Sequence, residues 1–187
     1  MTPVQRSEAS RQAILKAALE LVEEVGYAKL SIEGIAARAG VGKQTIYRWW
    51  PSKGAVLFDA VLDRSEPDGA SALPDTGDLA ADLKLVLRAT VDEFNDPRQD
   101  RLLRALALEI ARDPQLAELY RERLDGPMHE RKKARLESAG LHESIDLDVA
   151  VELIWSPLAQ RWLNHGPLTH AFADAVVDTA LRGLQHH

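Results

Sequence analysis

Residues 31–53 have the sequence SIEGIAARAGVGKQTIYRWWPSK, which predicts two short helices joined by a tight turn. Gly40 can adopt the positive φ that a turn between two nearly perpendicular helices requires. Val41 and Ile46 are apolar where the pair must pack on a preceding helix, and Ala36 is small enough to let the two helix backbones approach. The pattern is typical of a helix-turn-helix, whose second helix lies in the major groove of DNA.

The side chains expected on the outer face of the second helix suit DNA. A lysine can donate to guanine, a glutamine can pair with adenine, and a threonine methyl can contact thymine. Candidates for base contacts are Lys43, Gln44 and Thr45, and candidates for phosphate contacts are Ser31, Tyr47, Arg48, Trp49 and Lys53. Helix–Gly–helix segments also occur in proteins that never bind DNA, so geometry alone leaves both interpretations open. The polar, aromatic second helix favours DNA, whereas Trp50, which precedes Pro51, is expected in the core.

The rest of the chain predicts an all-α fold. Ala and Leu supply 54 of the 187 residues, and both are strong helix formers. No stretch alternates apolar and polar residues long enough to predict a strand. We expect about nine helices, over residues 7–25, 32–39, 43–49, 53–64, 78–94, 97–112, 114–138, 146–164 and 169–184. Gly126-Pro127 should bend or split the seventh helix, and Pro157 should interrupt the eighth.

The chain is expected to form two domains. Pro, Gly and small polar residues concentrate in residues 65–77, which predicts a linker between a three-helix helix-turn-helix domain (residues 1–64) and a larger helical domain (residues 78–187). The net charge of −6 argues at first against a nucleic-acid partner. However, residues 1–64 hold 9 Lys/Arg and 7 Asp/Glu, and residues 65–187 hold 14 and 22. Because the field that attracts phosphate is local, the acidic second region does not exclude DNA binding.

Several chemistries have no support in the sequence. The chain has no cysteine, which excludes a disulfide framework, a thiolate zinc site and a cysteine nucleophile. No Gly-rich phosphate loop, Ser-His-Asp pattern or metal-ligand spacing of histidines occurs, so we expect no enzyme activity, no cofactor and no metal. No apolar run approaches the roughly 20 residues that span a bilayer. The first residues also lack an apolar signal core, so we expect a cytoplasmic protein. His186 and His187 are either native or a remnant of an expression tag, so no inference rests on them.

Residues 8–64 resemble the DNA-binding domain of TetR-family transcriptional regulators. The resemblance rests on the segments LVEEVGYAKLSIEGIAARAGV and GKQTIYRWWPSKGAV. It implies a bacterial, all-α homodimer that binds a palindromic operator and releases it when a small molecule enters the C-terminal domain. The implied DNA contacts are Ser31, Lys43, Gln44, Thr45, Tyr47, Trp49 and Lys53. Two positions depart from the family pattern: Gly42 stands where a capping serine is frequent, and Gly34 stands where Glu or Gln would complete a capping box with Ser31.

Residues 78–187 match the same family in layout, so we expect a ligand cavity among the helices of this region. Apolar and aromatic side chains would suit an apolar or planar small-molecule effector. The candidate lining residues are Phe94, Leu106, Glu109, Ile110, Tyr120, Met128, Trp155, Arg161 and Trp162, with His129 as a further polar candidate. Ordinary core packing is the alternative for each of them.

The last two long helices are expected to form a four-helix dimer interface with their copies in a second chain. The candidate interface residues are Leu153, Leu158, Phe172, Val176, Ala180 and Leu184, which can also fill the core of their own chain. The resemblance therefore implies a ligand-responsive, homodimeric repressor. Two alternatives stay open: an activator or ligand-independent regulator, and a small-molecule-binding helical protein or enzyme without specific DNA binding.

Overall fold

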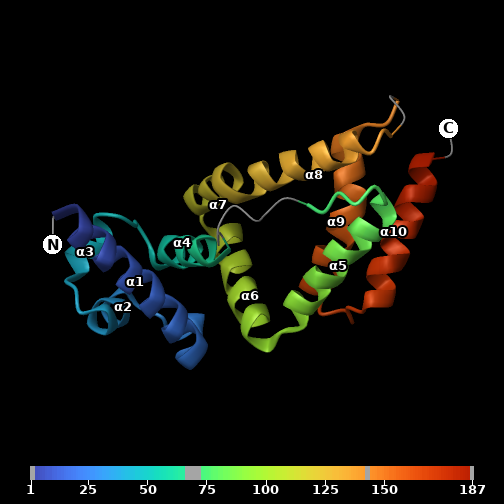
Figure 1. Ribbon diagram of the computed structural model, residues 1–187. Coiled ribbons are helices and arrows are strands. Elements are labelled where there is room, and N and C mark those ends of the chain that lie inside the picture. The colour runs from blue at the N-terminus through green and yellow to red at the C-terminus, as the bar shows by residue number, and fades with distance from the viewer. Residues whose placement is uncertain (1–2, 66–72, 142–143, 186–187) are drawn as a thin grey trace. The chain divides into compact units, whose positions relative to one another are not determined.

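The computed structural model describes residues 3–65, 73–141 and 144–185, and every regular element among them is helical (Figure 1). The α-helices are α1 (Pro3–Val25), α2 (Ile32–Ala39), α3 (Lys43–Tyr47), α4 (Lys53–Ser65), α5 (Leu79–Asn95), α6 (Pro97–Arg112), α7 (Pro114–Tyr120), α8 (Gly126–Ser138), α9 (Leu147–Leu163) and α10 (His170–Gln185). A 3-10 turn (Tyr27–Lys29) follows α1. The all-α prediction is confirmed, while His186 and His187 lie outside the described residues.

Contacts divide the chain into two compact units. The first consists of Met1–Ala70 and Arg101–Tyr120, and the second of Ser71–Asp100 and Arg121–His187. The sequence predicted a division at residues 65–77, whereas most of α6 and all of α7 group with the N-terminal helices. One reason is a close approach of α4 to α7, where a Cβ atom added to Gly54 would lie 3.1 Å from Leu116 Cδ2.

The core of the first unit joins the helix-turn-helix segment to α1 and α4. Ile14, Ile35, Ile46 and Phe58 are at most 1% exposed and come from four different helices. Trp50 is 3% exposed, which confirms its predicted place in the core. Its indole Nε1 donates to Asp59 Oδ2 over 2.8 Å, so the one polar atom of this buried ring has a partner.

In the second unit, α5 and α10 pack antiparallel along a row of ion pairs. Lys84 pairs with Asp178, Arg88 with Asp174 and Asp92 with His170, at distances of 2.6 to 2.7 Å. The α5 partners are spaced four residues apart in rising order and the α10 partners in falling order, which fixes the helix direction. Beneath them lies an apolar core of α5, α9 and α10, formed by Leu83, Leu87, Val91, Ala150, Ile154, Leu158, Ala173 and Val177.

A buried ion pair fastens the segment before α5 to α8. Arg135 and Asp82, whose side chains are 7% and 5% exposed, approach to 2.9 Å. The same guanidinium donates from Nε to the Pro74 carbonyl over 2.7 Å, and Asp82 accepts from the Thr76 N–H and hydroxyl over 2.9 and 2.8 Å. The hydrogen bonds from Thr76 and the Arg135 charge lower the pKa of Asp82. We call these four residues the buried tether.

Two prolines affect their helices differently from the predictions. Helix α9 continues from Leu147 to Leu163 with Pro157 inside it, so the predicted interruption is wrong: the ring removes one N–H donor, but the turns on both sides persist. Residues 114–138 remain one helical run, although five residues, Arg121–Asp125, form a π-helical turn between α7 and α8. The irregularity thus begins before the predicted Gly126-Pro127 site. The reason is that Pro127 has no N–H to donate to a carbonyl of the preceding turn.

Candidate functional site

Local signals shape the helix-turn-helix segment as predicted. Ser31 precedes α2, and its hydroxyl oxygen accepts a hydrogen bond from the Gly34 N–H over 3.1 Å, so the predicted cap is confirmed. Gly40 ends α2 in the left-handed conformation, with φ 66°, as predicted. The Val41 N–H then donates to the Ala36 carbonyl over 3.0 Å, which closes the turn before α3 begins.

Helix α3 is held by its apolar face and presents its polar side chains to solvent. Ile46 is fully buried, whereas Lys43, Gln44, Tyr47 and Arg48 are exposed, with Tyr47 55% accessible. An exposed tyrosine of that size on a short, anchored helix is available to a partner. We refer to Lys43, Gln44, Tyr47 and Arg48 as the reading face.

Of the predicted DNA contacts outside the reading face, Thr45 and Trp49 are less exposed and Ser31 already has a structural role. Helix α3 ends at Tyr47 and not at Trp49, so Arg48 and Trp49 belong to the turn that follows. Thr45 is half-buried, and Trp49 is half-buried with its ring centroid 5.5 Å from that of Trp50. Ser31 is exposed, although its oxygen already serves as the helix cap.

Lys53 has a structural partner set that the sequence did not reveal. Its ammonium donates to the carbonyls of Tyr27 and Leu30 over 3.2 and 3.0 Å, and it lies 4.3 Å from the centroid of the Tyr27 ring. Two of its three N–H groups are therefore used to fasten the connection between α1 and α2. This arrangement gives Lys53 a positioning role, and the phosphate contact expected of it at the start of α4 stays a prediction.

Glu33 was not among the predicted site residues, yet it lies beside the reading face. Its Oε1 is 2.9 Å from Lys43 Nζ, and both side chains are more than half exposed. The hydrogen bond from Lys43 lowers the pKa of Glu33 and raises the pKa of Lys43. A second surface pair, between Arg38 and Glu24 over 2.7 Å, joins α2 to α1. The signal in the sequence was an acidic residue in the first turn of α2, with a lysine ten positions later across the turn.

The nine candidates for ligand binding fall in both compact units. Leu106, Glu109, Ile110 and Tyr120 belong to the first unit. There Leu106 is 4% exposed and Tyr120 packs edge-on against Phe58, with ring centroids 6.0 Å apart. Glu109 lies near Tyr27, whose buried hydroxyl has no hydrogen-bond partner among the described residues. Burial and the Glu109 carboxylate raise the pKa of Tyr27.

The remaining ligand candidates lie in the second unit, and several have partners there. Phe94 stacks on Trp162 with ring centroids 4.7 Å apart, and Trp162 donates from Nε1 to Asp100 over 2.6 Å. Lys132 lies 5.0 Å from the Trp155 ring centroid, and Arg161 lies 3.6 Å from that of Phe172. Met128 is half-buried, and His129 pairs with Asp148 over 2.8 Å. None of the nine candidates lines either groove described next.

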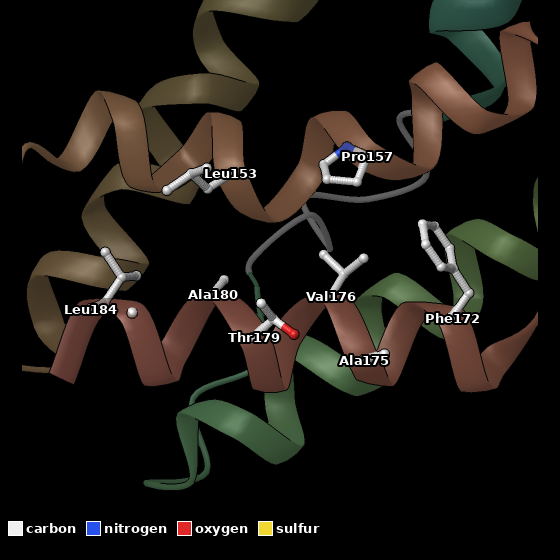
Figure 2. Close-up of a pocket in the computed structure, with 9 residues that line it drawn as sticks. Leu153, Pro157, Phe172, Ala175, Val176, Thr179, Ala180 and Leu184 are labelled. Atoms are coloured by element: carbon white, nitrogen blue, oxygen red, sulfur yellow. The ribbon is translucent and has the colours of Figure 1, made fainter. Parts of the chain in front are cut away.

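Five of the six candidates for the dimer interface line one apolar groove between α9 and α10 (Figure 2). The groove has a volume of about 450 Å³, and Leu153 and Pro157 reach it from α9 while Phe172, Val176, Ala180 and Leu184 reach it from α10. Leu158, the sixth candidate, is 2% exposed and packs in the core of its own unit, so its place in the interface was predicted wrongly. A second groove of about 600 Å³ shares Leu153 and Pro157 and extends to His129, Asp148 and Glu152.

Residues 3–65, 73–141 and 144–185 contain neither a membrane-spanning helix nor a group of three metal-ligating side chains. None of the helices in these ranges is long and apolar enough to cross a membrane. Within the same ranges, no three His, Cys, Asp or Glu side chains lie close enough to one another to hold a metal ion.

Both parts of the chain match models of one family. Residues 14–60 match the model described as bacterial regulatory proteins, tetR family, and residues 73–180 match the model described as tetracyclin repressor-like, C-terminal domain. The second match alone covers more than half of the chain.

Individual relatives agree with these matches. The chain is 34% identical over 186 residues to the uncharacterized HTH-type transcriptional regulator YdeS of Bacillus subtilis (strain 168), covering 96% of this chain and 92% of that protein. It is 32% identical over 186 residues to the DNA-binding transcriptional repressor TetR of Mycobacteroides abscessus, covering 95% of each. The crystal structure of the TetR family transcription regulator SCO0332 superposes with a TM-score of 0.73 at 34% identity, covering 93% of this chain and 97% of that one. The chain therefore belongs to the TetR family and is a DNA-binding transcriptional regulator, not an enzyme.

Proposed function

We propose that this regulator is a homodimeric repressor that binds a palindromic operator and is released from it by a small molecule. The observation that carries the proposal is the reading face: four exposed side chains on α3 and its C-cap residue Arg48, opposite the fully buried Ile46 that anchors the helix. A helix held in this way keeps its side chains in one register against the base edges, which recognition in the major groove requires.

The apolar groove between α9 and α10 supports a homodimer. Leu153 is 52% exposed, and the groove is lined almost entirely by apolar side chains. A second copy placed by a twofold axis would cover this surface with the same surface of its own. It would also carry a second reading helix for the other half of a palindrome, about 34–36 Å from the first.

Repression and release by an effector are supported by likeness. The relative from M. abscessus, 32% identical across nearly the whole chain, is named as a DNA-binding transcriptional repressor. Residues 73–180 match a domain model described as tetracyclin repressor-like. A small molecule that binds better to a state with misaligned reading helices would weaken operator binding. Because coupling is reciprocal, the operator would weaken binding of the small molecule by the same factor.

The DNA-binding part is tested with duplexes selected from a random pool by the unaltered protein. We expect Lys43→Ala and Tyr47→Ala each to weaken binding to the selected duplex about tenfold, as loss of one base or backbone contact does. Lys16→Ala is the matched control, because Lys16 is an exposed lysine on α1 with one acidic partner, Glu20, as Lys43 has Glu33. Equal affinity of all three variants and the parent would exclude α3 as the reading helix.

The dimer is tested separately by sedimentation. Leu153→Asp should shift the protein toward monomer, because it places a charge in the apolar groove. Leu85→Asp changes a leucine that is 63% exposed on α5 and serves as the control, since Leu85 does not line the groove. A dimer that withstands Leu153→Asp as well as Leu85→Asp would place the interface elsewhere.

A further inference from the structure

We propose that Glu33 determines specificity, because its carboxylate holds the Lys43 ammonium away from phosphates until a matching base is met. The inference rests on the proposed function of α3 as the reading helix and assigns a role to a residue outside that helix. It concerns the selection of DNA sequence, beyond binding itself.

The position of Glu33 is fixed by the start of α2. Ser31 caps the helix through the Gly34 N–H, and Glu33 lies in the first turn. A glutamate at position 34 would be placed for a capping box with Ser31, but that position is glycine, and a Cβ atom there would lie 3.3 Å from the Ser31 hydroxyl oxygen. The carboxylate of this turn is thus one residue earlier, where it meets Lys43 at 2.9 Å.

The pair is close but exposed to water. The side chains of Lys43 and Glu33 are 53% and 64% accessible, so the ion pair is screened and can open at little cost. Lys43 can therefore leave Glu33 for the O6 and N7 acceptors of a guanine. A phosphate brings its own negative charge close to the Glu33 carboxylate, whereas the guanine acceptors are uncharged.

The weak charge of the whole region makes this one carboxylate important. Residues 1–64 carry a balance of only two positive charges, and Lys43 and Arg48 are the cations of the reading face. Neutralising Lys43 halves the charge that this face offers to any phosphate backbone. Attraction that is independent of sequence falls, whereas a correct base contact is retained, and the ratio of specific to non-specific binding rises.

The test is Glu33→Gln, which removes the charge and keeps the shape of the side chain. Its affinity is measured for the selected duplex and for a scrambled duplex of equal length, over a range of salt concentrations. We expect binding to the scrambled duplex to strengthen about three- to tenfold and binding to the selected duplex to stay nearly unchanged, so that the ratio falls by about the same three- to tenfold. For Glu33→Gln, the slope of log affinity against log salt concentration should also steepen by roughly 0.9, which corresponds to one additional phosphate contact.

Two further variants connect the effect to Lys43. Glu23→Gln removes an exposed charge from α1 and should leave the affinity ratio unchanged. In a Lys43→Ala background, Glu33→Gln should no longer change the salt dependence. An unchanged ratio for Glu33→Gln, or a change equal to that of Glu23→Gln, would overturn the inference while leaving the proposed function intact. A parent protein that binds both duplexes equally would instead overturn the proposed function and the inference with it.

Discussion

Two ion pairs, one in each compact unit, show how burial separates structural from functional charge. Lys43 and Glu33 meet at the reading face with both side chains more than half exposed. Arg135 and Asp82 meet in the buried tether, where both are less than a tenth exposed and further hydrogen bonds reach Pro74 and Thr76. The two distances are the same, 2.9 Å, but water surrounds one pair and is excluded from the other. The first can exchange partners and suits recognition, whereas the second fixes the chain.

The largest effect should come from breaking the buried pair. Arg135→Met leaves the Asp82 carboxylate buried without its cation, which should lower Tm on the order of 10 °C. Arg131→Met, on the exposed side of the same helix, is the control and should change Tm by about 2 °C or less. Thermal unfolding followed by circular dichroism measures both. Similar Tm values for the two variants would contradict the assigned role of the tether.

A smaller loss is expected from a buried polar contact inside the first unit. Trp50→Phe removes the indole donor to Asp59, and unfolding in urea should show a loss of about 1–2 kcal/mol. Trp49→Phe makes the same chemical change at a half-buried ring and should have less effect. If Trp49→Phe were the more damaging of the two, burial would not be the deciding factor.

Acid should remove the stabilisation that the Asp82 carboxylate contributes in the buried tether. Because the pKa of Asp82 is lowered in the folded protein, the stabilisation is present above the ordinary carboxyl pKa of about 4 and is lost as pH falls through the lower folded value. The difference in stability between the parent and Asp82→Asn should be constant from neutral pH down to about pH 5 and then shrink. Urea unfolding at a series of pH values measures it, and a difference that grows on acidification would contradict this linkage.

The smallest effect on stability is expected at the exposed pair. Lys43→Met should change Tm by about 1 °C or less, because a screened surface pair contributes little. The same variant should still weaken DNA binding, since Lys43 is on the reading face. A loss of Tm comparable to that of Arg135→Met would remove the contrast between the two pairs.

Most local features of the fold were predictable from the sequence, because their causes lie within a few residues. Ser31 and Ser52 cap α2 and α4 through donors three residues away. Gly40 provides the left-handed turn without a steric penalty. The helical spacing of apolar residues predicted the all-α class, and the anchoring of α3 by Ile46 followed from the same pattern.

The tertiary structure decided which side chains found partners far away in the chain. Asp82 and Arg135 are 53 positions apart, and Lys53 reaches carbonyls 23 and 26 positions earlier. The spacing of Leu158 alone suits the interface and the core of its own chain equally, and only the packing of α9 placed it inside. Residues 101–120 likewise joined the first unit through contacts that periodicity does not specify. The physical reason is that backbone propensity and capping act over one helical turn, whereas burial and ion pairing depend on which helix faces meet.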